Sequence, residues 1–254
     1  MKACDRTLFE YLLRLGDDQL VLGQRLAEWL GHAPVLEEDV ALANLSLDCL
    51  GCASQLLGLA GELEGRGRSA DDLAFRREES AFRNCLLVEQ PNGDFGATIA
   101  RQFLYDAFAY HLFGTLEDCR SPDLAAIARR AEKEVTYHLR HGRDWLIRLG
   151  DGTDESRERM QSHLERLWPY TEELFAEDDV TRELVPLGLA ADPADLKPRW
   201  ELVVSQSLAT ATLTAPEGEM PLLRGGRSGR HTEYLGHLLA EMQALHRAHP
   251  EATW

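Results

Sequence analysis

The sequence predicts an all-α protein, and the choice of apolar residues is the first observation behind that prediction. The 254 residues include 43 Leu but only 9 Val and 3 Ile. Leu loses little side-chain freedom in a helix, whereas Val and Ile are stiff and favour strands. The second observation is that the chain lacks the runs of Val and Ile that a buried parallel sheet requires. The third is a series of helix start and stop signals along the chain.

Four long helices are predicted in the first 150 residues. The first opens at a capping box formed by Thr7 and Glu10 and ends near Leu30, because Gly31 follows. The second is predicted over 36–64, where a glycine-rich segment stops it.

A polar stretch at 69–89 is predicted to hold one or two short helices. Asp94 is suited to cap a third long helix that ends near Cys119. The pair Ser121-Pro122 is typical of a helix start, and the fourth long helix is predicted to end near Leu149. Four long helices with short connections predict a four-helix bundle.

The rest of the chain is predicted to add shorter helices to that bundle. The segments are helices at about 153–168, 179–185, 193–212 and 232–248, with an exposed loop at 215–230. We therefore expect one domain over 1–254, with a core bundle at about 7–150 and accessory helices at about 153–250.

Charge and cysteine content exclude several classes of protein. The formal charge of −16 argues against nucleic-acid or anionic-membrane binding, which both need a positive surface. The cysteines are too few for a disulfide scaffold, and Cys49 and Cys52 are interpreted as small residues on a buried helix rather than a redox or zinc motif. We find no signal peptide and no stretch of about 18 apolar residues, so a cytoplasmic protein is expected.

Polar residues interrupt the apolar stripe of each long helix near its middle. In an antiparallel bundle these positions lie at one level, which would bring together Asp18 or Gln19, Asp48, Asp106, Glu134 and His138. A ferritin-like di-iron bundle places a Glu on each of two helices and Glu-x-x-His on each of the other two. Here Tyr137 stands three residues after Glu134. We therefore expect no metal ligands and no catalytic residues, but a vestigial polar cluster of Asp48, Asp106, Glu134 and His138.

A basic run at Arg224, Arg227 and Arg230 stands out in this acidic chain. One interpretation is a solvated loop. The other is contact with a phosphate-bearing ligand or with an acidic partner surface.

Four segments carry a resemblance to a known family: residues 13–34, 86–103, 132–154 and 231–243. They closely resemble the C subunits of bacterial phenylacetyl-CoA epoxidases, also called ring-1,2-phenylacetyl-CoA monooxygenases. The resemblance implies a ferritin-like bundle that pairs with a related A subunit. In that family the A subunit holds the di-iron centre and epoxidises the aromatic ring with O₂, and a flavin and iron–sulfur reductase supplies electrons from NADPH.

The resemblance implies a structural, non-catalytic subunit with no cofactor of its own, and the Arg224–Arg230 run becomes a candidate contact for CoA or a partner. Two other hypotheses stay open. The chain could be a di-iron oxidase or oxygenase with its own metal site, or a helical adaptor outside aromatic catabolism.

Overall fold

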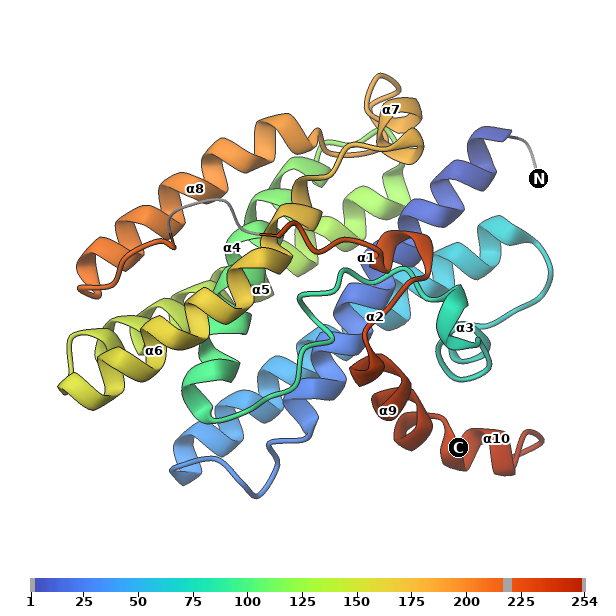
Figure 1. The fold of residues 1–254 in the computed structure, drawn as a ribbon. Coiled ribbons are helices and arrows are strands. Elements are labelled where there is room, and N and C mark those ends of the chain that lie inside the picture. Colours follow the sequence, from blue (N-terminus) through green and yellow to red (C-terminus); the bar gives the residue numbers. More distant parts are fainter. Residues whose placement is uncertain (1–2, 217–220, 253–254) are drawn as a thin grey trace. The chain divides into compact units, whose positions relative to one another are not determined.

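The computed structural model describes residues 3–216 and 221–252, and these form helices without any strand (Figure 1). The all-α prediction is confirmed. The elements are α1 (Ala3–Ala27), α2 (Leu36–Glu64), α3 (Ala70–Phe75), η1 (Glu79–Ala81), α4 (Phe95–Leu116), α5 (Pro122–Gly150), α6 (Asp154–Leu167), η2 (Trp168–Phe175), α7 (Asp179–Leu184), α8 (Pro193–Thr210), η3 (Gly226–Ser228), α9 (Glu233–Met242) and α10 (Ala244–Ala248).

Contacts within the chain group it into two compact units. The first comprises Met1–Gln90 with Gly225–Trp254, and the second comprises Pro91–Arg224. This grouping differs from the expected division near residue 150, because the last helices belong with the first ninety residues. That the whole chain forms one domain stays a prediction.

In the first unit, α1 and α2 lie side by side, and α3 packs on α2 (Figure 1). The bounds of α2 match the prediction, and Gly65 ends the helix in the left-handed conformation with φ 69°. The predicted capping box was wrong: Thr7 and Glu10 lie inside α1, which already includes Ala3. Residues 82–90, which follow η1, form an irregular segment that is almost entirely buried.

The apolar character of α2 corrects one expectation. By length and composition alone this helix could cross a membrane, although no such stretch was expected. In the structure 44% of the most apolar 18-residue stretch of α2 is buried. Leu42, Leu45 and Leu56 are among its fully buried residues. Cys49 and Cys52 are buried on this helix, as predicted.

In the second unit, α4 pairs with α5, while α6 and α8 also pack on α4. The helix starts follow the predicted local chemistry. The Asp94 side chain accepts a hydrogen bond from the Ala97 N–H, and Ser121 caps α5 in the same way. Trp200 of α8 donates a hydrogen bond from Nε1 to the Leu104 carbonyl at 2.9 Å, which anchors α8 on α4.

The predicted final helix is interrupted at Gln243, between α9 and α10. The buried Gln243 amide donates to the carbonyls of Ala74 and Arg77 at 3.0 and 3.1 Å. These bonds fasten the C-terminal helices to α3 and to Arg77, which follows it. They are tertiary contacts, so the local sequence pattern did not reveal the break.

Candidate functional site

The polar residues expected at mid-helix divide between the two units. Asp18 and Asp48 belong to the first unit, whereas Asp106, Glu134 and His138 belong to the second. Of these, Asp18, Asp106 and His138 are buried, and Asp48 and Glu134 are not fully buried. Each unit thus has polar side chains in its interior, and the structure shows what several of them bind. That the four residues form one vestigial cluster stays a prediction.

Asp106 lies on α4 with only 1% of its surface exposed. Its two carboxyl oxygens accept hydrogen bonds from Gln102 Nε2 at 2.9 and 3.0 Å. Burial raises the pKa of Asp106 to about 7, and the charge of His138 and the Gln102 hydrogen bond oppose that rise. Near neutral pH this carboxyl group is therefore partly protonated.

The donor set in this region does not fit a di-iron centre. Glu134 of α5 forms an ion pair with Arg130, one turn away, at 2.9 Å. Asp106 is held by an amide. Among the residues that the structure describes, no group of three or more His, Cys, Asp or Glu side chains could hold a metal ion. That none of Asp48, Asp106, Glu134 and His138 is a metal ligand stays a prediction.

The raised pKa of Asp106 leads to a testable prediction about how the stability of the protein depends on pH. The folded protein keeps a proton on Asp106 between pH 3.8, the ordinary value, and about 7, so its stability falls as the pH rises through this window. Asp106→Asn cannot ionise, and it should stabilise the chain by roughly 1–3 kcal/mol at pH 8. The gain should shrink at pH 5, as measured by urea denaturation at both pH values. A loss of stability at pH 8 would mean that the ionised carboxylate is required.

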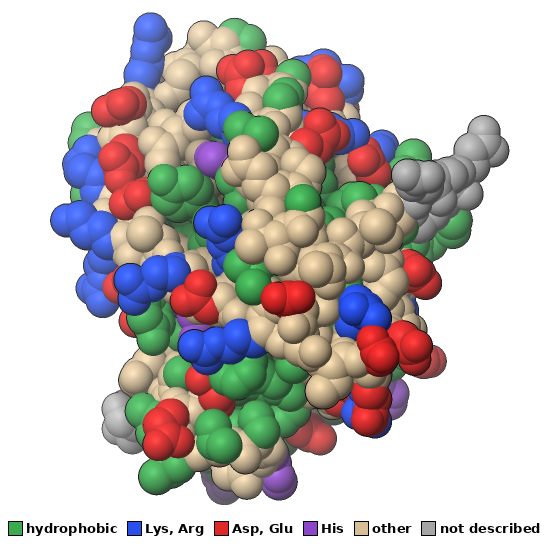
Figure 2. All heavy atoms as spheres, turned by 90° about the vertical axis from the view of Figure 1, so that its left-hand side faces the viewer, with side chains coloured by type: hydrophobic (Ala, Val, Ile, Leu, Met, Phe, Trp, Pro, Cys, Tyr) green, Lys and Arg blue, Asp and Glu red, His purple; other side chains and the backbone are tan. Residues whose placement is uncertain are grey.

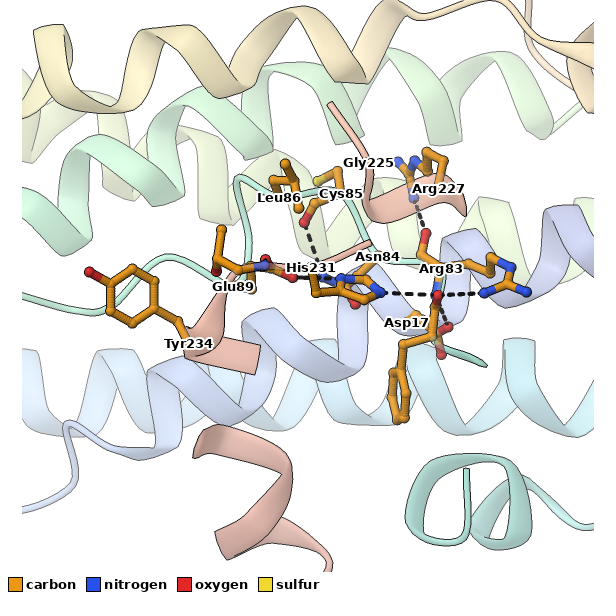
Figure 3. Close-up of polar contacts among 12 residues, drawn as sticks. Asp17, Arg83, Asn84, Cys85, Leu86, Glu89, Gly225, Arg227, His231 and Tyr234 are labelled. Atoms are coloured by element: carbon orange, nitrogen blue, oxygen red, sulfur yellow. Dashed lines mark hydrogen bonds and ion pairs between the residues drawn. The ribbon is translucent and has the colours of Figure 1, made fainter. Parts of the chain in front are cut away.

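The densest polar network lies in the first unit, where α1, residues 82–90 and the segment 225–232 meet. We call residues 225–232 the C-terminal strap (Figure 3). Asp18, which is fully buried, accepts hydrogen bonds from Arg227 Nη1 and Nη2 at 2.9 and 2.7 Å and from the Cys85 N–H at 2.7 Å. Arg227 also donates to the Arg83 carbonyl at 2.9 Å.

This pairing corrects the prediction that Arg227 lies in a solvated loop. Only 16% of its side chain is exposed, and its guanidinium group is committed to Asp18 and to backbone carbonyls. Burial raises the pKa of Asp18, and the charge of Arg227 opposes the rise. Arg224 and Arg230 are exposed and belong to different units, and their contact with CoA or a partner stays a prediction.

A second buried ion pair lies beside the first. The neighbouring Asp17 binds Arg77 through both carboxyl oxygens and accepts a hydrogen bond from the Arg83 N–H at 2.8 Å. The Arg77 guanidinium also lies 4.2 Å from the centre of the Phe82 ring. Adjacent carboxylates of α1 thus each bind one arginine, and the side-chain charges of both pairs balance.

Glu89 and His231 form a third pair, and the side chains of both are completely buried. Glu89 accepts hydrogen bonds from the Thr232 N–H at 2.6 Å and from Asn84 Nδ2 at 2.8 Å. His231 Nδ1 lies 2.8 Å from Glu89, and its Nε2 lies 3.2 Å from the Phe82 carbonyl. Since both ring nitrogens face acceptors, the geometry favours the doubly protonated imidazolium. Burial lowers the pKa of His231, but Glu89 outweighs burial, and the net shift of the pKa is upward.

Glycines let the strap approach the backbone of residues 80–86. A Cβ on Gly226 would overlap the Asn84 carbonyl. Gly229 has φ 76° and lies against the Ser80 carbonyl, so a side chain there would be excluded both by space and by backbone conformation. The close packing of the strap therefore depends on glycine at both positions.

Four charged residues of this network were not predicted from the sequence: Asp17, Arg77, Glu89 and His231. The one available signal was Glu89 itself, which stands in the apolar run LLVEQ. A charged residue within an apolar run is expected to be buried, and a buried charge needs a partner.

The charged groups of this network bind one another within the chain, and they hold the strap in place.

Comparisons with known proteins agree with the resemblance of the four segments. A family model described as "Phenylacetic acid catabolic protein" matches residues 1–254. A protein of Escherichia coli (strain K12), described as the C subunit of 1,2-phenylacetyl-CoA epoxidase, is 51% identical over 247 residues, which cover 97% of this chain and 99% of that protein. The chain belongs to the phenylacetic acid catabolic protein family.

Proposed function

We propose that this chain is the structural subunit of a phenylacetyl-CoA epoxidase, and that it supports a separate di-iron catalytic subunit in the catabolism of phenylacetate. The observation that carries the proposal is the similarity to the C subunit of such an epoxidase along nearly the full length of both chains. Identity of 51% over 97% of this chain favours the same role in the same kind of complex.

The chemistry of the interior supports a non-catalytic role. The buried carboxylates Asp17, Asp18 and Glu89 are bound by Arg77, Arg227 and His231 of the same chain. Asp106 is bound by an amide and has a pKa of about 7. Burying a charged group away from water costs free energy unless an opposite charge pairs with it. Here the paired cations are the side chains of Arg77, Arg227 and His231. The redox chemistry is therefore assigned to iron in the catalytic subunit and to the reductase.

Two helix pairs, α1 with α2 and α4 with α5, are the parts that a ferritin-like four-helix bundle needs. We propose that fold for the chain, together with a cytoplasmic complex in which the catalytic subunit is the main partner. Arg224 and Arg230 are the proposed contacts for CoA phosphates or for a partner. Arg227 is removed from that set, since Asp18 binds it.

Coexpression with the catalytic subunit of the same epoxidase, followed by sizing and iron analysis, tests this proposal. We expect a stable heteromer in which iron follows the catalytic subunit, and isolated chains of this protein with substoichiometric iron. A di-iron centre in the isolated chain, lost in Asp106→Ala or Glu134→Ala variants that still fold, would instead establish an oxidase or oxygenase. Absence of any heteromer would also contradict the proposal.

A further inference from the structure

Exposed apolar side chains gather around the turn between α1 and α2. Ten large apolar side chains are exposed in the described residues, and five of them lie within residues 30–47. They are Leu30, Val35, Leu36, Val40 and Leu47, with 54, 50, 75, 52 and 66% of their surface exposed. Figure 2 shows hydrophobic side chains gathered in the lower part of the face that it draws. Patches of this kind mark interaction sites on soluble proteins.

The patch continues along α2 as a line of residues at helical spacing. Leu36, Val40, Leu47, Ser54 and Gly58 share one face of the helix, and none of them is charged. From the first to the last the line is about 33 Å long, at roughly 1.5 Å per residue. We call this line the α2 stripe. It lies apart from the buried face that carries Leu42, Leu45 and Leu56, so α2 is apolar on two sides.

The second half of the stripe is open and hollowed. A Cβ added to Gly58, or to Gly51 at the edge of the stripe, would meet no atom within 4 Å, so another backbone could approach closely there. Beside Ser54, a cavity of about 190 Å³ lies between α1, α2 and α3. Leu20, Leu50, Leu57 and Phe75 are among the residues that line it. An apolar side chain of a partner helix could insert into this cavity.

The charges at the edge of the stripe indicate what covers it. Glu37 and Glu38 follow Leu36 directly. Carboxylates in this position repel an anionic lipid surface. They complement a protein face whose apolar centre is bordered by Lys or Arg. The apolar stripe and the acidic border together point to a helix of another protein.

We propose that the α2 stripe is the face on which this chain docks the catalytic subunit, through an apolar helix of that subunit bordered by basic residues. The inference rests on the proposed function, which supplies the identity of the partner, whereas the location of the face comes from exposure, spacing and charge. Leu47 and Val40 are the expected anchors, because both are apolar and exposed, with Leu47 at the middle of the stripe and Val40 within its apolar half.

The test uses the full chain, coexpressed with the catalytic subunit, and titration of the separated subunits. In the variant Val40→Glu/Leu47→Glu, the affinity should fall by about tenfold or more for each substitution. The thermal midpoint of the isolated chain should stay unchanged, since both side chains are already in water. Leu202→Glu is the matched control, because Leu202 is a leucine of α8 with 57% of its surface exposed. This control should bind like the wild type.

The outcomes separate this inference from the proposed function. Wild-type affinity in the double variant would overturn the inference and leave the proposed function standing. Failure of the wild-type chain to bind the catalytic subunit would overturn both. A wild-type homodimer that the double variant dissociates, seen by light scattering, would make a second copy the occupant and overturn the inference. Flotation of the wild type but not the variant with phosphatidylglycerol vesicles would overturn it in favour of a membrane.

Discussion

Glu89→Ala should lower the free energy of unfolding by about 3–5 kcal/mol, as expected when one member of a buried ion pair is removed. The substitution takes the acceptor from His231, from Asn84 Nδ2 and from the Thr232 N–H together, in a site where both charged side chains are fully buried. Arg25 would still bind the backbone carbonyl at position 89, so the damage should come from the lost carboxylate. Urea denaturation followed by circular dichroism measures the effect.

Two variants bracket this result. Glu89→Gln keeps one acceptor oxygen and should fall between the wild type and Glu89→Ala. Glu172→Ala removes a carboxylate whose ion pair with Lys197 is partly exposed, and it should cost less than about 1 kcal/mol. Equal losses for Glu89→Ala and Glu172→Ala would show that the buried network does not hold the strap.

Arg227→Met should be the second large effect, at about 2–4 kcal/mol, because it leaves the Asp18 carboxyl group buried without its cation. Protonation of Asp18 will limit the loss, since burial already raises its pKa. The double variant Asp18→Asn/Arg227→Met should be less damaging than the sum of the single variants, because both members of the pair are gone. Urea denaturation of the three variants measures the coupling.

The surface pair Arg182–Asp179 supplies the control for this experiment. Arg182→Met should leave the stability nearly unchanged, since both side chains are largely in water. Strict additivity of Asp18→Asn and Arg227→Met would contradict the direct ion pair.

Helices whose ends are set by local chemistry were predictable from the sequence. The cap at Asp94, the start at Ser121-Pro122 and the stop at Gly65 depend on neighbours within a few residues, and the structure has all three. The predicted start of α1 is too late because a capping-box pattern also occurs inside a helix. Gln243 breaks the last helix through contacts with residues about 170 positions away, which no local pattern reveals.

In the candidate site, too, local features were predictable and distant contacts were not. The sequence placed Asp18 and Asp106 in the interior because both lie in apolar stripes. Their partners did not, because Arg227 lies 209 residues from Asp18, and a glycine-rich basic run is more typical of a solvated loop. Glu89 and His231 were missed for the same reason, since they are 142 residues apart. Periodicity locates a buried charge, and only the folded chain identifies what neutralises it.

The measurement that tests the structural role most directly is epoxidation of phenylacetyl-CoA by purified catalytic subunit and reductase, with and without this chain. We predict no sustained turnover without the chain, turnover when it is added back, and none by the chain with the reductase alone. Full turnover in its absence, or turnover by this chain without the catalytic subunit, would contradict a structural role.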